Sequence, residues 1–193
     1  MQTLTRKDLM SLEKYAEERS AFRARVMAHK RDRQVAVGAH ATLYFEDRLT
    51  IQYQIQEMLR IEKIFEAGDI EEELKAYNPL IPDGANWKAT FMLEYEDVAE
   101  RRAALARLSG VAERVYVRIG DHPRVYAVAD EDMGRENDDK TSAVHFLRFD
   151  LAPALVVGAR GGAAIACGID HPAYKGETIL MEAQRAALLA DLA

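Results

Sequence analysis

Residues 34–65 read QVAVGAHATLYFEDRLTIQYQIQEMLRIEKIF, and this stretch decides the fold class. In its first part, apolar side chains at every second position from Val35 to Phe45 share one face, which predicts a half-buried strand. Asp47 then stands where a helix N-cap belongs. The segment from Arg48 to Phe65 is apolar almost all round and predicts a helix that is buried on most sides. A strand followed directly by such a helix indicates a mixed fold.

The same patterns continue on both sides of this stretch. One or two amphipathic helices are predicted over 5–30. Downstream, helices are expected at 69–77, 98–108 and 152–160, strands at 87–95, 115–119, 125–129, 141–149 and 163–169, and a loop or irregular helix at 130–140. The pattern predicts an α+β fold with a mixed or antiparallel sheet of about six strands. We expect a single domain, 1–193, with an N-terminal helical segment at 1–33 and a C-terminal helix at 176–193.

Composition excludes several classes of protein. The chain has 193 residues, a single Cys and a net charge of −6, with 26 Lys and Arg against 32 Asp and Glu. One Cys rules out a disulfide framework and Cys-rich zinc modules, and the negative charge disfavours nucleic acid as a partner. The sequence has neither a secretory signal nor an apolar run long enough for a membrane span, so a cytoplasmic location is expected. The standard nucleotide-binding, hydrolase and metalloprotease motifs are missing.

Two charged residues stand on the predicted helix at 48–65. Glu57 and Arg60 share a stripe with Tyr53 and Gln56, at spacings of three and four residues. A buried carboxylate and guanidinium are costly unless they are paired. One interpretation is an ion pair that fixes helix register or a subunit interface. The other is a pocket in which Glu57 acts as base or ligand and Arg60 holds an anion.

Three histidines fall on predicted strands or strand ends, namely His40, His145 and His171. No pair has the local spacing of a metal motif, so a metal site would have to be assembled in space. Since one short helical crossover joins the strands of His145 and His171, these strands are expected to be parallel neighbours. The two rings would then meet at one end of the sheet, with Asp170 or Glu57 as orienting partners. The alternative is that each ring bonds a backbone carbonyl.

Basic residues concentrate at the end of the first predicted helix. They are Arg23, Arg25, Lys30, Arg31 and Arg33. Cations at this point complement the partial negative charge of the helix C-terminus, and contact with an acidic protein partner is the alternative.

Several long blocks occur in order: KDLMSLEKYAEERSAFRARVMAHKRDR, YFEDRLTIQYQIQEMLRIEKI, YNPLIPDGANWKATFMLEY, RVYAVADED, KTSAVHFLRF and GIDHPAY. Together they resemble a bacterial family known as domain of unknown function 3501, over roughly residues 5–175. The resemblance implies an association with rubrerythrin-like and iron–sulfur oxidoreductase proteins, and hence a redox protein partner in peroxide or redox metabolism. The paired Glu-x-x-His helices of a di-iron protein are missing, so the resemblance does not imply a rubrerythrin.

Two hypotheses of function follow. The first is a non-catalytic cytoplasmic accessory or binding protein of redox metabolism, which forms a homo-oligomer through the helix at 48–65. The second is a small-molecule or metal-dependent enzyme whose pocket gathers Glu57, Arg60, His145, Asp170 and His171. The enzyme hypothesis requires these five side chains to converge.

Overall fold

The computed structural model describes residues 3–129 and 141–193, so the acidic segment predicted at 130–140 lies outside the described residues. The helices are α1 (Leu12–Arg31), α2 (Arg48–Ile61), α3 (Ala67–Tyr77), α4 (Val98–Arg107), α5 (Pro153–Arg160) and α6 (Glu182–Leu189), with short 3-10 turns η1 (Arg6–Asp8), η2 (Asn78–Leu80) and η3 (Ala112–Arg114). The strands are β1 (Gln34–Ala36), β2 (Ala41–Phe45), β3 (Asn86–Leu93), β4 (Val115–Ile119), β5 (Val125–Tyr126), β6 (Val128–Ala129), β7 (Val144–Asp150), β8 (Ile165–His171) and β9 (Tyr174–Ile179).

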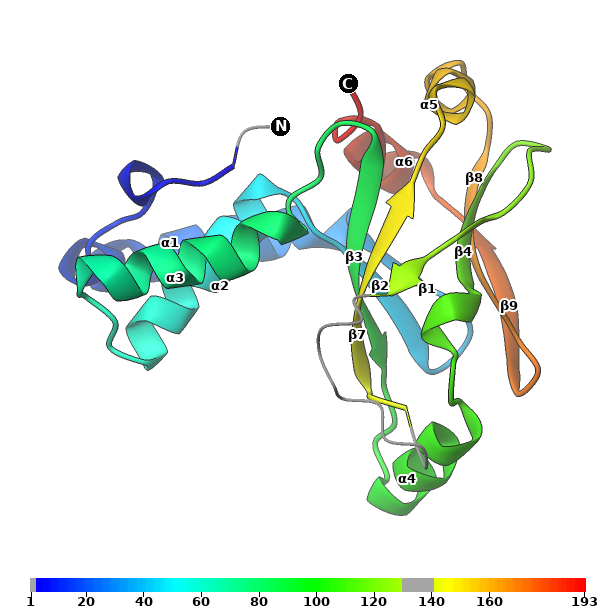
Figure 1. Ribbon diagram of the computed structural model, residues 1–193, viewed down its shortest axis with the longest axis horizontal. Coiled ribbons are helices and arrows are strands. Elements are labelled where there is room, and N and C mark those ends of the chain that lie inside the picture. The colour runs from blue at the N-terminus through cyan, green and yellow to red at the C-terminus, as the bar shows by residue number, and fades with distance from the viewer. Residues whose placement is uncertain (1–2, 130–140) are drawn as a thin grey trace.

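The strands form two antiparallel sheets (Figure 1). Sheet A has the order β1-β2-β3-β7-β6, and sheet B has the order β5-β4-β8-β9. The predicted α+β class is confirmed, and of the two predicted alternatives, a mixed or an antiparallel sheet, the antiparallel one is present. The strands are divided between two sheets. Side chains from both sheets share one hydrophobic core, which includes Trp87, Phe91 and Phe149 of sheet A and Val117 and Cys167 of sheet B. Burial raises the pKa of the Cys167 thiol, as expected for a small hydrophobic residue in a core.

The segment predicted as one strand over 34–45 is a hairpin. Strands β1 and β2 pair antiparallel, with Val35 opposite Leu43. Gly38 makes the turn with a φ of 75°, a conformation that side chains disfavour. A Cβ at this position would also meet the Tyr174 hydroxyl at 2.6 Å. The prediction was wrong because both halves of a hairpin keep the same alternation of apolar side chains.

Two predicted helices have different bounds in the structure. Helix α2 begins after its predicted cap, with the Asp47 side chain accepting from the Thr50 N–H, but it ends at Ile61 rather than at 65, close to Lys63 with its φ of 56°. The helix predicted over 176–193 is wrong in its first part. Residues up to Ile179 belong to β9, which pairs with β8, and α6 begins only at Glu182.

Helices α1, α2 and α3 lie together to one side of the two sheets, and we call them the helical lobe (Figure 1). Helix α2 contacts both α1 and α3. The lobe has its own apolar clusters, one that includes Ile51, Ile55 and Leu74 and another around Tyr15 and Phe22. It therefore carries a buried core of its own beside that of the sheets.

Candidate functional site

The carboxylate of Glu57 joins two helices of the lobe. It accepts from the Tyr15 hydroxyl at 2.6 Å and from Nε and Nη2 of Arg19 at 2.7 and 2.8 Å, all on α1. Arg60 lies 3.4 Å away on the same helix, and its side chain is 40% exposed against 16% for Glu57. Glu57 is therefore half-buried and Arg60 is exposed, so the expectation that both are buried is wrong for Arg60 and holds only in part for Glu57. The Arg19 hydrogen bonds, with those from Tyr15 and Arg60, lower the pKa of Glu57 to about 2 against the effect of burial.

Replacing Glu57 with Gln should destabilise the fold and change its response to acid. The loss of charge-assisted bonds between α1 and α2 is expected to cost about 1.5–3 kcal/mol at pH 7. Because the folded pKa is lowered, the Glu57 contribution is present above the ordinary pKa of 4.5 and is lost as the pH falls toward 2. Urea unfolding of both proteins between pH 7 and pH 3 checks this. A gap between wild type and variant that is as wide at pH 3 as at pH 7 would contradict it.

The two histidines predicted to meet lie in different sheets. His145 is in β7 of sheet A and His171 ends β8 of sheet B, so the prediction of neighbouring parallel strands is wrong. Nε2 of His145 lies 2.9 Å from the carbonyl of Ser142, and Nε2 of His171 lies 3.1 Å from the carbonyl of Ser109. Each ring thus bonds a backbone carbonyl. The helical crossover at 152–160 connects one sheet to the other, which sequence alone did not indicate.

The remaining candidates of the predicted pocket and metal site are also apart. His40 lies in the turn between β1 and β2 and stacks on Tyr95, with ring centroids 4.2 Å apart. Asp170 accepts from Arg124 at 2.8 Å on sheet B. Within residues 3–129 and 141–193, no group of three or more His, Cys, Asp or Glu side chains is placed to hold a metal ion. The five side chains of the enzyme hypothesis are thus distributed over α2, β7 and β8.

The basic run divides into exposed and buried members. Arg23, Arg25 and Arg31 are exposed and Lys30 is half-buried, as a protein-contacting surface requires. Arg33 is buried, so its assignment to this surface is a correction. Its guanidinium donates to the carbonyls of Phe45, Glu46 and Ala187 and pairs with a carboxylate near the C-terminus.

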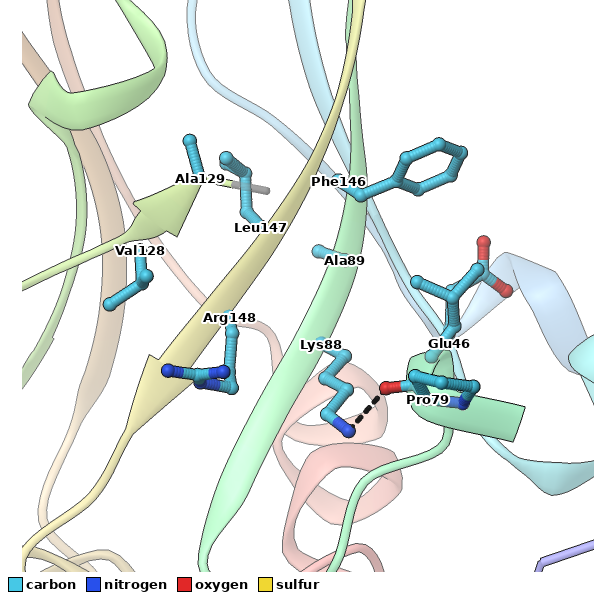
Figure 2. A pocket seen from close by; sticks show the side chains of 10 residues that line it. Glu46, Pro79, Lys88, Ala89, Val128, Ala129, Phe146, Leu147 and Arg148 are labelled. Atoms are coloured by element: carbon cyan, nitrogen blue, oxygen red, sulfur yellow. Dashed lines mark hydrogen bonds between the residues drawn. The ribbon is translucent and has the colours of Figure 1, made fainter. Parts of the chain in front are cut away.

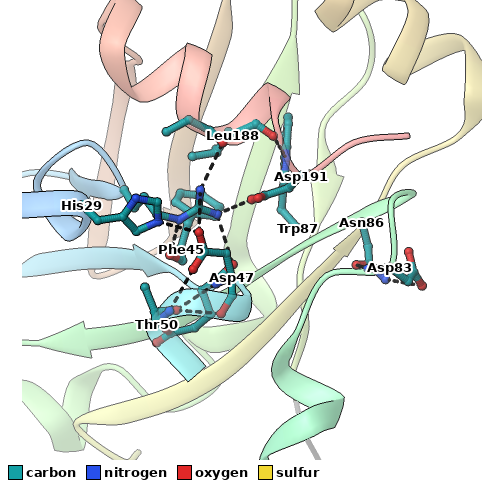
Figure 3. Close-up of polar contacts among 12 residues, drawn as sticks. His29, Phe45, Asp47, Thr50, Asp83, Asn86, Trp87, Leu188 and Asp191 are labelled. Carbon is teal, nitrogen blue, oxygen red and sulfur yellow. Dashed lines mark hydrogen bonds and ion pairs between the residues drawn. The ribbon is translucent and has the colours of Figure 1, made fainter. Parts of the chain in front are cut away.

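Figure 3 shows that buried network, which joins α1, the start of α2 and the C-terminal segment. Arg33 contacts Asp191 directly and lies 3.5 Å from Asp47, which in turn lies 2.5 Å from Nε2 of His29. Burial tends to raise the pKa of Asp47, but the Arg33 charge, the Thr50 N–H and His29 lower it overall. For Asp191 burial prevails and raises the pKa to about 6 despite Arg33. The network thus fixes the C-terminal segment to the end of α1 and the start of α2.

An apolar groove opens in the helical lobe between the start of α1, the end of α2 and the start of α3. Its volume is about 340 Å³, and most of its lining is apolar, including Leu12, Leu59, Ile70 and Phe65. Phe65 is 68% exposed and Ile61, four residues before it, is 57% exposed, so an exposed apolar area adjoins the groove. We call the groove together with these two side chains the apolar lobe surface.

Opposite charges lie on the two helices that α2 separates. Beyond Arg19, helix α1 carries Arg23, Arg25, Lys30 and Arg31 and no acidic residue. Helix α3 carries Asp69, Glu71, Glu72 and Glu73 against a single lysine. The lobe therefore presents a basic second half of α1 and an acidic α3. None of the helices in the described parts of the chain combines the length and the apolar character needed to cross a bilayer.

These features define an α+β protein with two antiparallel sheets and a helical lobe that carries an apolar surface. The chain belongs to the family described as "Protein of unknown function (DUF3501)", whose model matches residues 3–192. A crystal structure of a novel protein of unknown function from Burkholderia pseudomallei is similar over 100% of both chains, with 51% sequence identity and a TM-score of 0.94. No curated protein matches the chain.

Proposed function

We propose that this protein is a non-catalytic accessory protein of the cytoplasm that acts as a homo-oligomer through its helical lobe. The observation that carries the proposal is the apolar lobe surface, where Phe65 and Ile61 expose more than half of their side chains next to an apolar groove. Large exposed apolar side chains beside a concave apolar surface are typical of protein interfaces.

A second copy of this chain is the occupant that the charges favour. In a two-fold symmetric pair, the basic side of each lobe can face the acidic α3 of the other, so the complementary contact is made twice. Phe65 of one copy would enter the groove of the other. Ionic contacts of this kind steer association and weaken with salt, while the apolar contact persists.

A redox protein is the further partner class that the family resemblance implies. The exposed cations Arg23, Arg25 and Arg31 on α1 would suit an acidic surface on a rubrerythrin-like or iron–sulfur partner. The enzyme alternative has less support, because Glu57, His145 and Asp170 each have separate hydrogen-bond partners on separate elements.

Replacing Phe65 with Glu should dissociate the oligomer without unfolding the protein. A carboxylate cannot enter an apolar groove without losing its hydration, whereas on the surface of the monomer it is solvated. The matched control is Val157→Glu on α5, where an equally exposed valine (70%) lies outside the lobe. Light scattering should report a multiple of 21.7 kDa for wild type and control and 21.7 kDa for F65E. Equal masses for F65E and wild type would refute the assignment of the interface.

A further inference from the structure

A second cavity lies on sheet A, on the face turned away from the shared core (Figure 2). It has a volume of about 210 Å³ and lies over β3 and β7, between η2 and β6. This is smaller than the roughly 300–1,000 Å³ of sites that hold drug-sized ligands. Its apolar walls include Leu80, Val128 and Phe146. A ligand of this cavity must therefore be small and partly apolar.

Three charged side chains form one row along the floor of the cavity. Lys88 lies opposite Arg148 in the β3–β7 ladder, and Arg148 lies opposite Val128 in the ladder with β6. Glu46 follows β2 directly and its N–H donates to the Lys88 carbonyl, so it is the neighbour of Lys88 on the other side. The order across the sheet is thus carboxylate, ammonium, guanidinium.

Among the described residues, neither cation of this row forms an ion pair with Glu46, the carboxylate of the row. Like charges directly opposite each other destabilise a sheet, and a carboxylate opposite an ammonium is expected to form a cross-strand ion pair. Lys88 instead donates from Nζ to the carbonyls of Pro79 and Ile81. Among the described residues, this leaves one N–H of the ammonium without an acceptor. Burial lowers the pKa of Lys88, and so does the Arg148 charge, against the charges of Asp83 and Asp150. A bound carboxylate would oppose both effects, because its negative charge favours the protonated form of Lys88.

Glu46 and Arg148 also have atoms that can form hydrogen bonds with a ligand. Glu46 is 5% exposed, and one of its oxygens accepts from the Thr90 hydroxyl at 2.7 Å. Its second oxygen accepts no hydrogen bond within the described part of the chain. Arg148 uses Nε for Asp150 at 3.0 Å, and its two terminal nitrogens donate to no group among the described residues. The row alone has one carboxylate and two cations, and Asp150 paired with Arg148 brings the four side chains to no net charge. This set suits a ligand that carries one charge of each sign.

We propose that this cavity binds a small zwitterionic α-amino acid with an apolar side chain. Its carboxylate is held by Lys88 and Arg148, its ammonium by Glu46, and its side chain by the apolar walls. Bidentate contact with a guanidinium and a second contact with an ammonium fix the carboxylate, while the buried Glu46 selects for the amine. This site is separate from the apolar lobe surface, so the proposal stands or falls independently of the oligomer.

Isothermal titration of the full chain with three matched probes tests the proposal. L-Valine carries both charges, 3-methylbutanoate lacks the ammonium, and 2-methylpropan-1-amine lacks the carboxylate. Valine should bind at millimolar concentration, and each of the other two should bind at least about tenfold more weakly, as expected when one charged hydrogen-bond partner is removed. The proposal is overturned if valine does not bind, or if 3-methylbutanoate binds as tightly as valine.

Two variants locate the binding in the cavity. Glu46→Gln keeps a group that can accept from Thr90, and Arg148→Gln changes an exposed side chain, so both variants should remain folded. Each should weaken valine binding about tenfold or more, whereas Lys175→Gln on the exposed edge of β9 should leave it unchanged. If valine binds equally to E46Q, R148Q and wild type, the ligand occupies another place and the assignment fails.

Discussion

Replacing Arg33 with Met is expected to lower the free energy of unfolding by about 3–5 kcal/mol, because it leaves two buried carboxylates without their cation. The Arg33 side chain is 2% exposed and faces Asp191 and Asp47, which are 3% and 13% exposed. Urea denaturation measures the loss. Arg31→Met, which changes an exposed cation two residues away, is the control and should shift stability by less than about 0.5 kcal/mol.

The pH dependence of this loss in stability shows whether it comes from the charge of Arg33 or from the packing of its side chain. Burial already raises the pKa of Asp191 to about 6, so its ionisation costs stability as the pH rises through that value. Without Arg33, the pKa of Asp191 rises further and the pKa of Asp47 rises from its lowered value, so each carboxylate can take a proton at low pH. The gap between wild type and R33M should therefore widen from pH 5 to pH 8. A constant gap would show that the guanidinium acts only by filling space.

Replacing Trp87 with Ala should cost about 3–5 kcal/mol, as expected for the loss of a large buried aromatic side chain. Trp87 is fully buried, meets Phe45 edge to face, and donates from Nε1 to the Leu188 carbonyl at 2.9 Å. The expected result is both a lower melting temperature and faster hydrogen exchange in α6. Trp87→Phe keeps most of the side-chain volume and should therefore lower the free energy of unfolding by less. Unchanged exchange in α6 in the alanine variant would contradict the view that Trp87 holds this helix.

Local patterns predicted those elements that depend on nearby residues. The cap at Asp47 and the alternation of β3 are properties of a few neighbouring residues, and both are present. The hairpin at Gly38 depends on a distant contact with Tyr174, whose hydroxyl donates to the Val37 carbonyl and accepts from the His40 N–H. No local pattern carries that information. The helix predicted over 176–193 includes the second half of β9 because only Leu180 and Met181 separate this strand from α6.

For the candidate site residues too, sequence patterns do not reveal partners that are distant along the chain. The stripe on α2 indicated that Glu57 needs a partner, but the identity of Arg19 depends on how α1 packs against α2. Arg33 resembled its exposed neighbours in sequence, although its buried partner Asp191 lies 158 positions away. Lys88 and Arg148 each occupy an ordinary outward position of a strand, and nothing local connects either of them with Glu46, which follows β2. Only the strand register places them in one row.

Sedimentation equilibrium of the unmodified chain at micromolar concentration tests the central claim most directly, namely that the helical lobe is a self-association surface. The claim predicts a mass that is a multiple of 21.7 kDa and that decreases when salt is raised, since the basic α1 and the acidic α3 contribute ionic contacts. A mass of 21.7 kDa at every concentration and salt level would contradict it, because the apolar lobe surface would then have no second copy to cover it.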